Sequence, residues 1–161
     1  RKTSRYYKIL AHEHFPEADY TIWHGGWLQI IKDPTGLLKF LKDNDIAMEP
    51  HRERGCIYAE ANTCIQRRLV NPMRAREQMK AYRDDGYPAN NGLTSAFLIV
   101  RKNTEKIAEF ENFWWEQVDT YTVRDQLSLC YALWKTGVAY DKLPLGAKRS
   151  GFYKVHTHAR R

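Results

Sequence analysis

The clearest pattern in the chain is an apolar, β-prone run at residues 20–23, a Gly-Gly pair at 25–26 and a second β-prone run at 27–31. This pattern predicts two strands joined by a sharp bend in which only residues without a Cβ fit. Ligands collect where such strands end in α/β proteins, because the loops there face a crevice rather than the core. A plain hairpin with a bulge is an equally good interpretation of the pattern alone.

Helical and extended patterns alternate along the rest of the chain. Further strands are predicted at 46–48, 96–100 and 140–142, and helices at 3–12, 34–42, 57–67, 72–83, 104–119 and 122–135. The polar segment 49–55 and the segment 84–92, which is rich in Gly, Pro and Asn, are predicted loops. This order of elements predicts a mixed α/β fold.

Size and composition narrow the possible classes of protein. The 161 residues, 43% hydrophobic and 13% aromatic, predict a single domain with a real core, spanning 1–161. No apolar run approaches the roughly 18 residues that cross a bilayer, and no signal peptide is visible. Three cysteines without metal-site spacing predict reduced thiols and a cytoplasmic location. The net charge of +7 favours anionic partners such as nucleotide diphosphates, nucleic acid, acidic glycans or lipid headgroups.

The segment Thr-Val-Arg-Asp-Gln-Leu-Ser at 122–128 is the first candidate for chemistry. Asp125 stands at the predicted start of a helix beside Arg124 and Gln126, and a neighbouring cation can hold a general base ionised. The spacing of Thr122 and Asp125 also fits a capping box, in which both side chains bind free N–H groups of the helix. The sequence leaves both roles open, and one residue can serve both.

Two loops are candidate ligand contacts. The segment 51–54, His-Arg-Glu-Arg, precedes a helix, so its guanidinium groups and the free helix N–H groups can hold phosphate oxygens. The segment 82–92 carries aromatic, Asn and Asp side chains, which can stack on and hydrogen-bond a sugar or a base. A solvated charged loop is the alternative for the first segment, and ordinary turn chemistry is the alternative for the second.

Three histidines are candidates for a metal site. His24 lies beside the Gly-Gly pair, and His156 and His158 lie in the C-terminal tail. No acidic residue is close to His24 in the sequence, and His-x-His alone is not specific for metal. Structural or surface roles are therefore the more typical interpretation, and the sequence assigns no metal ligand.

Short motifs in a fixed order extend over most of the chain. They are Ser4-Arg5, Lys8-Ile9-Leu10, His12, residues 19–23, Asp33-Pro34, His51-Arg52, Arg54, Cys56-Ile57-Tyr58, Glu60-Ala61, Gln78, Tyr82, Gly86, Pro88, Gly92-Leu93, Arg101, Trp115 and residues 124–128. Their order and spacing resemble the TOD1/MUCI70-type glycosyltransferase-like domain family, formerly described as DUF616. The resemblance implies a GT-A-like fold, with a mixed sheet flanked by helices. It also implies transfer of a sugar from a nucleotide-sugar donor to a glycan or other hydroxyl acceptor.

The resemblance also implies a set of site residues. It implies Asp125 as the catalytic base. The resemblance and the candidate segments described above together predict these residues for substrate and donor binding: Arg5, Lys8, His24, Gly25, Gly26, His51, Arg52, Arg54, Glu60, Tyr82, Asn91, Arg124 and Gln126. Two places depart from the family pattern, since Gly25 and Trp27 stand where the family has Asp and Asn, and Ser95 replaces a second acidic residue. The family's first nucleotide-binding strands also have no counterpart here, so we expect a shortened domain.

These departures change the expected chemistry. The family's acidic motif implies Mn²⁺ or Mg²⁺, but the motif is absent, so the sequence assigns no cofactor. Arg and Lys can stabilise a departing diphosphate in place of a metal ion. Two other classes stay open: a degenerate relative that binds glycans or partners without catalysis, and a nucleic-acid-associated protein. The spread of the charge along the chain disfavours the nucleic-acid alternative.

Overall fold

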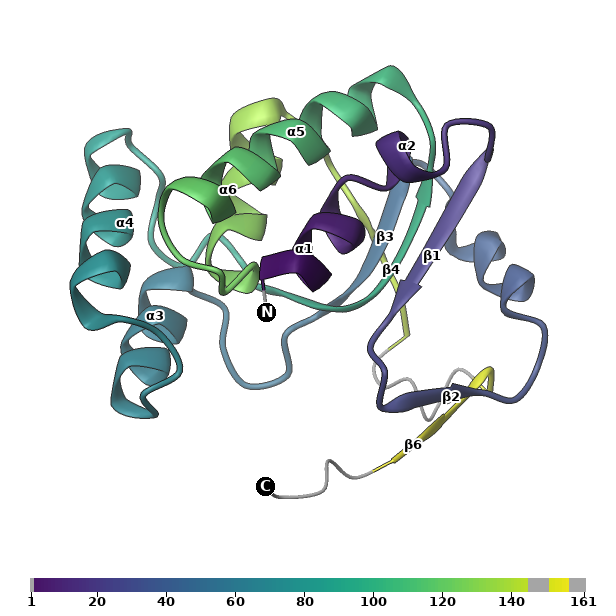
Figure 1. Cartoon of the computed structure of the whole chain (residues 1–161), viewed down its shortest axis with the longest axis horizontal. Coiled ribbons are helices and arrows are strands. Elements are labelled where there is room, and N and C mark those ends of the chain that lie inside the picture. Colours follow the sequence, from purple (N-terminus) through teal and green to yellow (C-terminus); the bar gives the residue numbers. More distant parts are fainter. Residues whose placement is uncertain (1, 145–150, 157–161) are drawn as a thin grey trace.

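A mixed four-stranded sheet forms the centre of the computed structural model, which describes residues 2–144 and 151–156. Its strands are β1 (Tyr20–His24), β3 (Ile46–Pro50), β4 (Thr94–Lys102) and β5 (Asp141–Lys142), in the order β1-β4-β3-β5 (Figure 1). β4 is antiparallel to both β1 and β3, whereas β5 is parallel to β3. The mixed α/β class predicted from the order of elements is confirmed.

Helices cover one face of this sheet and continue beyond one end of it (Figure 1). They are α1 (Lys2–Ile9), α2 (Ala11–His14), α3 (Ile57–Gln66), α4 (Pro72–Asp84), α5 (Glu105–Thr120) and α6 (Gln126–Thr136). α5 packs against α6 and α1, and α3 packs against both α4 and α6. The predicted helix at 3–12 is divided at Leu10, and the last helix begins four residues later than predicted.

The other face of the sheet carries a 3-10 helix, η1 (Pro34–Phe40), and a two-stranded antiparallel ribbon of β2 (Leu28–Ile30) and β6 (Tyr153–Val155). β1 and β2, on either side of the Gly-Gly pair, therefore join different sheets (Figure 1). The hairpin interpretation is wrong, because β1 finds its partner in β4 rather than in the strand that follows it.

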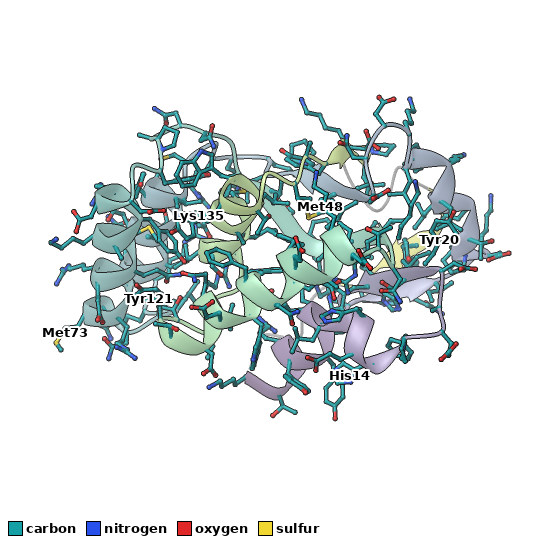
Figure 2. All side chains as sticks on the ribbon, turned by 90° about the horizontal axis from the view of Figure 1, so that it is seen from above. His14, Tyr20, Met48, Met73, Tyr121 and Lys135 are labelled. Atoms are coloured by element: carbon teal, nitrogen blue, oxygen red, sulfur yellow. The ribbon has the colours of Figure 1, made fainter. Side chains whose placement is uncertain are left out.

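Apolar residues of β3 and β4 alternate between the two faces, as their period of two requires. Met48 and Ile99 pack with Trp114 of α5 on one face, while Ala47 and Val100 pack on the other. A third apolar cluster lies between α3, α4 and α6. Met73, by contrast, projects from the outer side of α4 (Figure 2). The three clusters hold the helices and the ribbon against the sheet.

Two further sequence expectations bear on the fold. Cys56 is half-buried, Cys64 and Cys130 are buried, and none of the three forms a disulfide. Within residues 2–144 and 151–156, no helix is long and apolar enough to cross a membrane.

Candidate functional site

A break in the pairing of β3 with β4 shapes the surface at one end of the sheet. Met48 is opposite Ile99, but the next residue, Glu49, is opposite Ser95. Residues 96–98 of β4 therefore leave the ladder on the β3 side, as in a β-bulge. Glu49 and Pro50 were predicted to begin a polar loop, yet they extend β3, and Glu49 is only 1% exposed.

Two adjoining hollows meet at this break, and together we call them the groove. The glycine hollow, about 760 Å³, is lined by Ser4, Arg5, Lys8, Trp23, His24, Gly25, Gly26, Trp27, Ala96, Asp125 and Gln126. The arginine hollow, about 300 Å³, is lined by Arg52, Glu53, Arg54, Glu60, Thr63, Cys64, Arg67 and Leu69. Both hollows also contain His51, Ser95, Phe97 and Arg124. Five segments of the sequence thus converge on one site, at residues 4–8, 23–27, 51–69, 95–97 and 124–126.

All but two of the predicted site residues line the groove. Tyr82 is 1% exposed and stacks on Tyr131 in the core, with ring centroids 3.7 Å apart. Asn91 lies at a separate hollow, beside Trp134 and Tyr140. The prediction that segment 82–92 contacts the same ligand as the other residues is therefore corrected.

Aromatic surface in the groove comes instead from Trp27 and Phe97. Their ring centroids are 5.1 Å apart, and both rings line the glycine hollow. The sequence did not single out this pair, because Trp27 lies in the turn after β1 and Phe97 lies on β4, and the pairing of β1 with β4 brings them together.

Asp125 holds two cations at the glycine hollow. The carboxylate is buried, accepts a hydrogen bond from Arg5 Nε at 3.1 Å and pairs with Lys8 Nζ. It makes no hydrogen bond to the N-terminus of α6. Thr122 is also occupied elsewhere, since its hydroxyl donates to Gln78 at 2.8 Å. The capping-box interpretation of residues 122–125 is therefore wrong, and the ion-paired carboxylate is the feature to explain.

Lys8 is a buried ammonium group at the edge of the groove. Burial lowers the pKa of Lys8, and the charge of Asp125 opposes this shift. The backbone that carries Lys8 is fixed by Arg101, which donates from Nη2 to the Lys8 carbonyl at 2.7 Å. Arg101 itself pairs with Glu111 at 2.8 Å, and both side chains are almost fully buried. A buried ion pair thus satisfies the C-terminal end of α1 and fixes Lys8 over the hollow.

Glu60 joins the two sides of the arginine hollow. Its carboxylate accepts from Arg54 Nε at 2.5 Å and lies 3.5 Å from Arg124 Nη2. Burial alone raises the pKa of Glu60, but the hydrogen bond from Arg54 and the two nearby guanidinium charges hold that pKa below its usual value. The ionised carboxylate keeps the segment before α3 and the turn before α6 next to each other.

Glu49 is a further buried carboxylate close to Arg52 of the arginine hollow, and the sequence did not single it out. Glu49 stands directly opposite Ser95, the position at which the resemblance led us to expect an acidic residue. Its carboxylate is 3.9 Å from Arg52 Nη2. The cross-strand register brings Glu49 to this place, because the break in pairing puts it opposite Ser95. No local sequence pattern indicates this pairing.

The described residues around His24 and His156 do not fit a divalent metal site. The His24 ring packs near Tyr153, with centroids 5.5 Å apart, and His156 Nε2 is 2.8 Å from Gln29 Oε1. Among residues 2–144 and 151–156, no three His, Cys, Asp or Glu side chains are arranged to hold a metal ion. His158 lies outside the described residues.

The indole of Trp27 occupies the space next to Gly25. A Cβ at Gly25 would lie 2.7 Å from Trp27 Nε1, whereas a Cβ at Gly26 meets nothing within 4 Å. The expectation that both glycines exclude a side chain thus holds only for Gly25. A side chain at position 25 would therefore have to displace the indole of Trp27.

We expect Gly25→Ala to lower the free energy of unfolding by about 1–3 kcal/mol, because the new methyl overpacks against the indole. Urea unfolding measures this loss, and Gly26→Ala is the matched control, expected to stay within about 0.5 kcal/mol. In a Trp27→Asn background the cost of Gly25→Ala should disappear. An unchanged cost in that background would contradict the steric explanation.

Comparison with known proteins defines the class. The chain matches the family model of the TOD1/MUCI70, glycosyltransferase-like domain, over residues 1–145, and it belongs to this family. It is similar to a curated protein of Arabidopsis thaliana named probable hexosyltransferase MUCI70, with 27% identity over 139 residues. The match covers 80% of this chain but 24% of that protein, so the chain spans about a quarter of its relative's length. No solved structure matches the chain.

Proposed function

We propose that this domain binds a nucleotide-sugar donor in the groove and transfers the sugar to a hydroxyl acceptor, on a GT-A-like arrangement of sheet and helices. The observation that supports this proposal is the convergence of Lys8, Arg5 and Asp125 with the bend at residues 25–26 in one hollow. Family membership supports the same class of reaction.

The cations suit a reaction in which a diphosphate departs. As the bond from the anomeric carbon to the phosphate oxygen breaks, negative charge grows on the nucleoside diphosphate. Lys8, Arg5 and Arg124 line the hollow and offer fixed positive charge and hydrogen bonds to that group. The proposed reaction therefore proceeds without the acidic metal motif.

Asp125 is the base in this proposal. It is the one carboxylate among the described residues that line the glycine hollow. Its ion pairs with Lys8 and Arg5 hold the carboxylate in place in the hollow. Asp125 would take the proton of the acceptor hydroxyl while that oxygen bonds to the anomeric carbon, after phosphate groups of the donor engage the two cations.

A second candidate, a domain that binds glycans or partners without catalysis, is favoured by a different observation. Lys8 and Arg5 each engage one oxygen of Asp125, which reduces the access of a hydroxyl proton to the carboxylate. This candidate predicts binding without turnover.

One set of experiments distinguishes the two candidate functions. Isothermal titration with UDP-, GDP- and TDP-sugars should show saturable binding that persists in EDTA, and Arg5→Gln should weaken binding about tenfold. Arg76→Gln, on the exposed side of α4, is the matched control. No binding of any donor would count against the proposal, whereas binding without release of free nucleotide in the presence of acceptors would support the second candidate.

A further inference from the structure

His51 occupies the junction of the two hollows and lines both of them. Its backbone N–H donates to the Leu93 carbonyl at 2.7 Å, which fixes the residue at the end of β3. The ring is fixed as well, because Nδ1 accepts hydrogen bonds from the backbone N–H groups of Glu53 at 3.2 Å and Arg54 at 3.1 Å. Both the position and the orientation of the imidazole are therefore determined by the backbone.

These two hydrogen bonds decide where the ring carries its proton. A backbone N–H can only donate, so Nδ1 must present its lone pair and cannot hold a hydrogen. The neutral ring therefore carries its hydrogen on Nε2, at the other edge of the imidazole. In this tautomer His51 has one N–H to donate and no free lone pair to accept a proton.

The surroundings of His51 keep the ring neutral. Burial is the main cause that lowers the pKa of His51, and the charges of Arg54 and Arg124 lower it further. Glu60 and Glu53 act in the opposite direction, but the net shift is downward from 6.5. Protonation would also break both hydrogen bonds to Nδ1, since a charged ring has no lone pair to offer.

We propose that His51 is a positioning residue that donates one hydrogen bond from Nε2 to a phosphate oxygen of a bound nucleoside diphosphate, and that it is not an acid or a base in the reaction. The inference rests on the proposed function, because it requires the diphosphate to reach the junction. Arg124 and Phe97 share that junction. The arginines attract the anion from many directions, whereas a single fixed N–H selects one orientation.

Nitrogen NMR of the 161-residue chain labelled with ¹⁵N-histidine tests the tautomer and the contact together. At pH 7 the His51 Nδ1 signal should be of the unprotonated type and Nε2 of the protonated type, and saturating UDP or GDP should move the Nε2 signal. A hydrogen on Nδ1, a charged ring at pH 7, or an Nε2 signal that is unchanged when the nucleotide is bound would each overturn the inference.

Two variants distinguish the hydrogen-bond donor at Nε2 from the acceptor at Nδ1 that holds the loop after residue 51. In His51→Asn the side-chain oxygen can still accept from the backbone N–H groups two and three residues later, but the donor at the Nε2 position is lost. His51→Gln keeps a donor with nearly the same reach. We expect His51→Asn to bind UDP about tenfold more weakly and His51→Gln to retain most of the affinity. Equal affinity of His51→Asn and wild type, or equal loss in both folded variants, would overturn the inference.

The pH dependence of stability gives a measurement without any ligand. The unfolded chain binds a proton at His51 near the usual pKa, while the folded chain does so only at a lower pH. The neutral ring therefore contributes stability that is fully present above about pH 6.5 and is lost as the pH falls. His51→Asn should lack this part of the loss between about pH 6.5 and 5. Identical pH profiles of stability for His51→Asn and the wild type would overturn the inference that the folded chain keeps this ring neutral.

The failure of this inference is distinguishable from the failure of the proposed function. If the wild-type chain binds none of the nucleotides, the proposed function is overturned, and the positioning role is overturned with it. If the wild type binds and His51→Asn binds equally well, only the inference is overturned.

Discussion

Asp125→Ala is expected to lower the free energy of unfolding by about 3–5 kcal/mol, because it leaves the buried ammonium of Lys8 and the half-buried guanidinium of Arg5 without their shared carboxylate. Urea unfolding followed by circular dichroism measures the loss. Asp84→Ala is the matched control, since Asp84 pairs with Lys80 on the exposed surface of α4 and should cost at most about 0.5 kcal/mol.

A second substitution shows whether the uncompensated charge is the cause. Lys8→Met removes the buried ammonium, so the double variant Lys8→Met/Asp125→Ala should recover part of the stability lost in Asp125→Ala. Strictly additive losses would contradict the ion pair as the source of the effect. Sugar transfer should be lost in Asp125→Ala, which lacks the proposed base, and in Lys8→Met/Asp125→Ala, which also lacks the Lys8 cation.

Arg101→Met is expected to be similarly destabilising, at about 3–5 kcal/mol. Arg101 is 2% exposed and pairs with Glu111, which would remain buried beside His12 alone. The carbonyls of Lys8 and Ile9 at the end of α1 would lose their donors at the same time. Unfolding by urea tests the prediction.

The neighbouring residue on β4 provides the control for Arg101. Lys102 pairs with Asp45 at the surface, with 36% and 34% of the two side chains exposed, so Lys102→Met should cost less than about 1 kcal/mol. At a temperature where both variants are folded, nucleotide affinity should fall only in Arg101→Met, because Lys8 and Arg5 lie on the helix that Arg101 fixes. Equal nucleotide affinities of Arg101→Met and Lys102→Met would show that the position of α1 does not affect donor binding.

The elements predicted with local signals agree best with the structure. Asn71 caps α4 by accepting from the N–H groups of Met73 and Arg74, Thr104 caps α5, and both helices lie within one residue of their predicted ranges. Strand 96–100 is also present, although β4 is longer at both ends. These features depend on residues within one turn or one strand, so a local pattern is sufficient to find them.

Two of the wrong predictions depended on distant contacts. The segment 82–92 has the composition of a sugar-contacting loop, but Tyr82 stacks on Tyr131 in the core. Asp125 has the spacing of a cap, but α1 brings two cations to its carboxylate. In each case the local propensity was real, and a partner more than 45 residues away determined the outcome.

Local periodicity, turn chemistry and the ordered motifs are sufficient for the mixed α/β class, the approximate positions of most helices and the family. They are also sufficient to name most of the residues that line the groove. They cannot show that Glu49 stands opposite Ser95, that Trp27 covers Gly25, or that His51 carries its proton on Nε2. Each of these depends on strand register or on hydrogen bonds set by the folded backbone, because a shift of one residue in a strand turns every side chain to the opposite face.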